Sequence, residues 1–161
     1  MKKILTICIL TAMLFTTVGC NKPNQEEISS GETLYAAFKQ AVNDNPEATA
    51  EELANIIIKN KIIRFEPMVM PVTEGWLMGF DAETIEGFKE GAAFAPTISV
   101  IPFLGYVFIL EEGADVNAFI NTLKNHANLC WNICTAAEEV TAGNAGQIVF
   151  FLMCNKDINA E

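Results

Sequence analysis

The sequence predicts an α+β domain, with helices packed on an antiparallel or mixed sheet, that follows an N-terminal signal peptide. Two segments carry helix-capping patterns in front of apolar residues at helical spacing. Two other segments are apolar at consecutive positions, which is typical of central strands covered on both faces. Helical segments come before, between and after the predicted strands, and this order favours the α+β class. With 161 residues, of which 51% are hydrophobic, the chain can bury the core of about one domain.

The N-terminus has the pattern of a bacterial lipoprotein signal peptide. Two lysines precede an apolar run over residues 4–15, which is too short to span a membrane, and Gly19 stands directly before Cys20. This pattern resembles a lipobox, in which the cysteine thiol receives a diacylglycerol and becomes the first residue of the mature protein. We therefore predict a signal peptide over residues 1–19 and lipidation at Cys20. The alternative is ordinary signal cleavage, or a cysteine that is merely buried.

The folded domain is predicted over residues 31–161, after a lipidated cysteine and polar tether over residues 20–30. Removal of Lys2 and Lys3 with the signal peptide leaves eight basic against twenty acidic residues, a net charge of −12. This acidity argues against a nucleic-acid groove. A charge-steered partner is expected to be a basic protein or a metal ion. The chain is expected to be held at the membrane by its acyl chains and not by its surface. The alternative is that the acidic surface only keeps the domain soluble.

Two capping boxes predict the first two helices. The first helix begins after Ser29 and runs to about Val42, where the Asx residues before Pro46 end it. The second begins after Thr49 and ends near Asn60, with apolar residues at helical spacing.

The next segment, residues 65–80, is β-prone and interrupted by prolines, so it predicts one or two short strands at a sheet edge. Asp81 is predicted to cap a short helix that carries Ile85 and Phe88. Strands are then predicted over residues 94–101 and 105–110.

A long helix is predicted from Ala114 to about Cys134, with a core stripe that includes Cys130. The final strand, residues 147–154, is predicted to pair with the residues around Val140 across a Gly-Asn-Ala-Gly loop. The apolar strands 106–110 and 148–153 are expected to be central in the sheet.

Between Thr49 and Cys154 the chain contains the helix TAEELANIII, the turn-and-helix LMGFDAETIEGF, the strand-to-helix passage GYVFILEEGADVNAFINTLK and the final strand GQIVFFLMC. In this order, these stretches resemble a family of uncharacterised bacterial lipoproteins that carry one small domain of unknown function. The resemblance implies the fold and the lipid anchor, and it supplies no active site.

One set of side chains has the chemistry of a metal site. His126, Cys130 and Cys134 are spaced by four, which places them along one side of the predicted long helix, and thiolate with imidazole is a ligand set for zinc or Cu(I). The two cysteines also follow the apolar stripe of that helix, where a buried cysteine packs as a small hydrophobe. Core packing or a disulfide is the favoured interpretation over metal binding.

The predicted hairpin suggests which cysteines form a bridge. If the chain turns between Asn144 and Ala145, Cys154 lies opposite Thr135 and beside Cys134. In an oxidising compartment this geometry favours a Cys134–Cys154 disulfide and leaves the remaining cysteine of the helix as a buried free thiol. The rival prediction is that all three cysteines and the histidine bind one metal.

No catalytic motif stands out, because adjacent acid pairs point apart and the one histidine has no neighbouring Ser-Asp context. We therefore expect a lipid-anchored, non-catalytic cell-envelope domain that binds a partner protein or ligand, with no cofactor. The alternative is a metal- or redox-handling envelope lipoprotein that uses His126, Cys130, Cys134 and Cys154.

Overall fold

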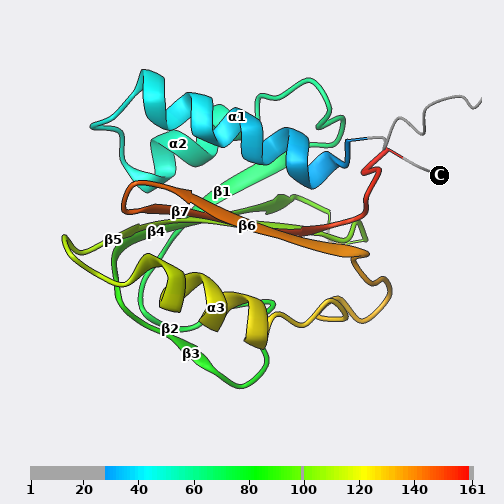
Figure 1. Ribbon diagram of the computed structural model, residues 1–161. Helices are drawn as coiled ribbons and strands as arrows, with labels where there is room; N and C mark the ends of the chain where they lie inside the picture. Colours follow the sequence, from blue (N-terminus) through cyan, green and yellow to red (C-terminus); the bar gives the residue numbers. More distant parts are fainter. Residues whose placement is uncertain (1–27, 99, 160–161) are drawn as a thin grey trace, which may run out of the picture.

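A five-stranded antiparallel sheet forms the middle layer of the fold, with the strand order β1-β4-β5-β7-β6 (Figure 1). The computed structural model describes residues 28–98 and 100–159, so the predicted signal peptide and Cys20 lie outside the described residues. The predicted α+β class is confirmed, and β1, which contains two prolines, lies at an edge as predicted. The strands of the sheet are β1 (Pro67–Val72), β4 (Phe88–Pro96), β5 (Phe103–Leu110), β7 (Ile148–Cys154) and β6 (Glu139–Ala145).

Helices lie on both faces of this sheet (Figure 1). On one face are α1 (Ser30–Asp44) and α2 (Ala50–Ile57). On the other are α3 (Val116–His126) and a two-stranded sheet of β2 (Gly75–Trp76) and β3 (Thr84–Ile85). Among the residues described, none of the helices has the length and apolar character needed to span a bilayer.

The helix starts predicted from the capping boxes are confirmed. The Oγ of Ser29 accepts a hydrogen bond from the backbone N–H of Glu32 at 3.3 Å. Thr49 and Glu52 exchange the two reciprocal hydrogen bonds of a capping box at the start of α2. Both helices therefore begin where side chains satisfy their free N–H groups.

Two apolar cores, one on each face of the sheet, follow from strands that are apolar at consecutive positions. Successive side chains of a strand point to opposite faces, so Val107 and Phe150 pack beneath α1 and α2. Their neighbours Phe108 and Phe151 pack on the α3 side, and all four side chains are fully buried. The predicted central position of these two strands is confirmed, since β5 lies between β4 and β7 and β7 lies between β5 and β6.

Most connections between elements gather at two opposite ends of the sheet (Figure 1). The β2–β3 connection, residues 77–83, lies instead on the α3 side, where it bonds to residues 126–128. Phe103 pairs with Cys154 near the end where the described chain begins at Ile28, and we name this the tether end. Ile109 pairs with Ile148 near the opposite end, which we name the groove end. The tether end comprises residues 28–29, 58–66, 97–98, 100–102, 127–138 and 155–159, and the groove end comprises residues 45–49, 73–74, 86–87, 111–115 and 146–147.

The short helix predicted after Asp81 is wrong. Ile85 and Phe88, which were expected on that helix, lie instead in β3 and β4. The carboxylate of Glu74 accepts hydrogen bonds from the N–H groups of Gly87 at 2.6 Å and of Phe88 at 3.3 Å, and Gly87 has a φ of +94°. Sheet pairing and this turn therefore override the local capping preference of the aspartate.

The long helix predicted to reach Cys134 ends at His126. The next residue, Ala127, is extended and forms an antiparallel bridge with Phe80. A contact with a distant part of the chain therefore ends the helix, and the apolar stripe alone could not reveal it.

The pairing of the final strand with the residues around Val140 is confirmed, but its predicted register is wrong. The turn lies two residues later than predicted, and Gly146 supplies it with a φ of +61°. Cys154 therefore pairs with Glu139 rather than with Thr135. This shift removes the geometric reason for the predicted disulfide.

Candidate functional site

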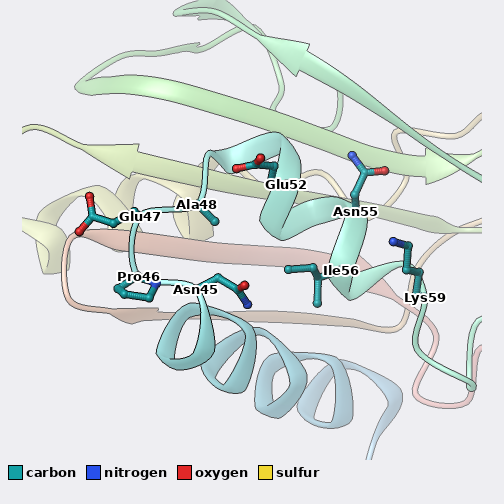
Figure 2. Close-up of a pocket in the computed structure, with 8 residues that line it drawn as sticks. All are labelled: Asn45, Pro46, Glu47, Ala48, Glu52, Asn55, Ile56 and Lys59. Carbon is teal, nitrogen blue, oxygen red and sulfur yellow. The ribbon is translucent and has the colours of Figure 1, made fainter.

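An open groove of about 550 Å³ lies between the last turn of α1 and the facing side of α2 (Figure 2). The α1–α2 connection and α2 itself form its walls. The lining consists of Asn45, Pro46, Glu47 and Ala48 from the connection, Glu52, Asn55 and Ile56 from α2, and Lys59 just after α2.

The backbone around the groove is fixed by local capping and by one contact with the sheet. Asn45 follows α1 just before Pro46, and both its N–H and its Nδ2 donate to the carbonyl of Ala41 at 3.0 Å. At the start of α2, the N–H of Ala50 donates to Oε1 of Glu90 in β4 at 2.6 Å. A carboxylate at a helix N-terminus is favoured by the partial positive charge there, so this bond holds α2 against the sheet.

The side chains of the groove differ in charge and in hydrogen-bonding capacity. Glu47 is exposed at one rim, and the carboxylate of Glu52 is held in its capping box. The Nδ2 of Asn55 donates to the backbone of the preceding turn, which leaves its Oδ1 as an acceptor. Ile56 is 38% exposed and adds an apolar contact, and Lys59 lies on the same groove. The lining therefore combines charge, amide hydrogen bonding and a small apolar surface.

A second hollow of about 330 Å³ adjoins the groove on the other side of the α1–α2 connection. It shares Pro46, Glu47 and Ala48 with the groove, and its other walls are the end of β5 and the start of β7. Glu90, Glu112 and Lys89 also line this hollow. The two hollows therefore share the connection, and their linings together contain four carboxylates and two lysines.

Charge is distributed unevenly between the two ends of the molecule. The connections of the groove end contain six acidic residues and no basic residue: Glu47, Glu74, Glu86, Glu111, Glu112 and Asp115. The connections of the tether end contain four basic residues, Lys59, Lys61, Arg64 and Lys156, and three acidic residues, Glu66, Glu138 and Asp157. The connections of the groove end are therefore purely acidic, whereas those of the tether end carry both signs of charge.

The residues predicted to bind metal are not brought together. His126 is half-buried at the end of α3, whereas Cys130 and Cys134 are exposed in the connection that follows it. Cys154 is buried at the end of β7, and these three cysteines are free in the described part of the chain. Among the residues that the structure describes, no group of three or more His, Cys, Asp or Glu side chains is placed to hold a metal ion.

The environment of Cys154 also disfavours thiolate chemistry. Its side chain is fully buried, and its Sγ lies 3.9 Å from Oε1 of Glu139. Burial, followed by the negative charges of Glu139 and Glu138, raises the pKa of the Cys154 thiol to about 12. A thiol that stays protonated at neutral pH is a weak nucleophile and a weak metal ligand.

A smaller hollow of about 170 Å³ lies on the α3 side of the sheet. Trp76 and Trp131 both line it, together with Asp81 and Asn128. The indole N–H of Trp76 donates to the carbonyl of Asp81 at 3.1 Å, and Oδ1 of Asn128 accepts the N–H of Cys130 at 2.9 Å. Both hydrogen bonds join residues close in sequence, so the turns that line the hollow are stabilised locally.

No family model, curated protein or solved structure matches this chain. The resemblance to a lipoprotein family therefore stays a prediction. The function has to be argued from the geometry and charge of the molecule.

Sequence reasoning missed the groove, because it treated the residues around Pro46 only as the end of a helix. The available indication was a short helix–helix connection with Glu47 at its centre, between two well-capped helices. The contribution of Glu90, forty residues further along, has no local indication in the sequence.

Proposed function

We propose that this chain is a lipid-anchored, non-catalytic domain of the cell envelope that binds a cationic partner protein or ligand in the groove. One observation carries the proposal: the groove begins at the last turn of α1, while the described chain begins beside the first turn of the same helix. A helix of 15 residues is about 22 Å long. A lipid tether at Cys20 would therefore hold the domain by the end that is opposite the α1–α2 connection.

The charge of the groove end supports a cationic partner. Carboxylates outnumber lysines by four to two in the linings of the groove and the adjoining hollow, and the six acidic residues of the nearby connections add to this negative charge. Such a surplus of negative charge attracts basic ligands and accelerates their association. The same charge is repelled by anionic head groups, so it favours an orientation in which the groove faces away from the bilayer. Ile56 and the amide of Asn55 add the apolar and hydrogen-bonding contacts that a peptide segment requires.

A short lysine-rich peptide can stand in for the partner in a binding experiment. In an NMR titration of the ¹⁵N-labelled Cys20→Ser chain, we expect the amide shifts of the α1–α2 connection, of α2 and of Lys59 to move. The shifts of residues 127–138 and 155–159 at the tether end should stay. The double variant Glu47→Lys/Glu112→Lys should weaken binding, because it reverses two negative charges beside the groove. Both side chains are exposed and neither caps a helix, so the fold should be unaffected.

A matched control separates the site from the net charge. Glu66→Lys/Asp157→Lys changes the charge by the same amount at the tether end, and it should leave peptide affinity close to that of the wild type. Equal weakening by both double variants, or shift changes spread over the whole domain, would contradict a specific groove.

A further inference from the structure

The tether end carries large apolar side chains that the described residues leave exposed. Ile28 is 79% exposed, Ile98 is 67% exposed and Val100 is 60% exposed. The connection between α3 and β6 adds Ile133, whose side chain is fully exposed. Single exposed apolar residues are ordinary, but apolar residues gathered at one end indicate an interaction surface.

Hydrogen bonds tie the segments of the tether end to one another. The N–H of Ser30 donates to the carbonyl of Lys156 at 2.7 Å, and the N–H of Ile158 donates to Oγ of Ser30 at 3.1 Å. Asn159 Nδ2 donates to the carbonyl of Ile62 at 3.0 Å. The start of the described chain is therefore held beside the residues that follow β7 and the connection that follows α2.

The β4–β5 connection belongs to the same surface. The N–H of Thr97 donates to the carbonyl of Glu66 at 2.9 Å, which joins this connection to the one before β1. A small hollow of about 200 Å³ lies between Val100 and Ile158, so the connection also borders the segment after β7. The apolar side chains thus stand on segments with fixed neighbours.

The local charge of this end suits a lipid surface better than the net charge of the chain suggests. Its connections contain four basic and three acidic residues, and the adjoining β2–β3 connection adds Asp81 and Glu83. All the charged residues in the groove-end connections are acidic, so repulsion from anionic head groups is stronger at the groove end than at the tether end. The overall charge alone led to the expectation that only the lipid would touch the membrane.

We infer that the tether end lies against the bilayer, with Ile98 and Val100 at the boundary between head groups and acyl chains and with Ile28 beside them. This inference rests on the proposed lipid anchor at Cys20. The eight residues from that anchor to Ile28 span at most about 29 Å, so the tether keeps this end close to the lipid. Transfer of apolar side chains from water into the interfacial region lowers the free energy, and this binding energy adds to that of the acyl chains.

Contact with the bilayer gives the tether end a definite role. A domain held only by a polar tether would be oriented only by the repulsion between its acidic end and the head groups, which salt screens. A surface that rests on the lipid instead keeps the acidic groove directed toward partners in the surrounding compartment.

The test places a tryptophan at each end of the full-length, acylated protein. Ile98→Trp reports the tether end, and Glu112→Trp is the matched control at the groove end, since both positions are exposed. Each variant is reconstituted into vesicles of phosphatidylcholine and phosphatidylglycerol with brominated acyl chains, which quench tryptophan on contact. The wild-type chain supplies the background from Trp76 and Trp131.

We expect the tryptophan added at position 98 to lose emission in brominated vesicles, and the one added at position 112 to show no loss beyond the background. Equal quenching of the two variants, or quenching of neither, would overturn the inference while leaving the anchor intact. Fatty-acid labelling of the same samples separates the two ideas. An unlabelled chain would overturn the proposed anchor and this inference together.

Discussion

Truncation of Phe150 to alanine tests whether the two faces of the sheet fold as one unit. Its ring is fully buried, and its centroid lies 5.4 Å from that of Phe38, 5.8 Å from that of Tyr35 and 6.1 Å from that of Phe94. Strands on both sides of β7 limit the collapse of the cavity that truncation would leave. We expect Phe150→Ala to lower the free energy of unfolding by about 3 to 5 kcal/mol, a large share of the ~5–15 kcal/mol typical of a domain.

The assay is urea unfolding of the soluble Cys20→Ser chain, followed by circular dichroism and by tryptophan fluorescence. Trp76 and Trp131 line a hollow on the α3 side, so fluorescence reports the face opposite Phe150. If the domain is one cooperative unit, both measurements should show the same loss. Phe108→Ala removes a buried ring from the α3-side core and should cost a similar amount.

Two results would refute this reasoning. A loss below about 1 kcal/mol for both variants would mean that these residues do not lie in central strands. A fluorescence transition that Phe150→Ala leaves unchanged would mean that the two cores unfold independently.

Three further predictions concern local features. A Cβ at Gly105 would overlap the ring of Phe94 on the neighbouring strand, so Gly105→Ala should cost about 1 to 3 kcal/mol in urea unfolding, and an unchanged midpoint would contradict the packing. Burial raises the pKa of the Cys154 thiol to about 12, so alkylation of the native protein at pH 8 should modify Cys130 and Cys134 quickly and Cys154 only after unfolding. Rapid alkylation of all three thiols would show that the end of β7 is open. Thr49→Ala removes the capping box of α2 and should cost about 1 kcal/mol, whereas Thr73→Ala, exposed and outside the helices, should cost much less; equal losses would argue against the cap.

The features that the sequence predicted correctly depend on neighbouring residues. The capping bonds of Ser29 and Thr49 join groups three residues apart, so both helix starts are visible in the sequence. Consecutive apolar residues in β5 and β7 likewise require cover on both faces wherever the strands lie.

The features that it missed depend on distant contacts. The end of α3 is set by the bridge from Ala127 to Phe80, and the hairpin register is set by which glycine takes a positive φ. The position of α2 beside the groove depends on the hydrogen bond from Ala50 to Glu90 in β4. The predicted metal site failed for the same reason, since the helix that should have aligned its ligands ends at His126.

The most direct test of a domain held by a lipid at one end is replacement of the predicted lipidated residue. The wild-type chain should incorporate labelled fatty acid and stay with the membrane fraction after a mild wash, and so should the control Cys130→Ser, which removes an exposed thiol elsewhere. Cys20→Ser should be exported, lack the label and be released by the wash. If Cys20→Ser kept both its label and its membrane association, the lipid anchor at this residue would be contradicted.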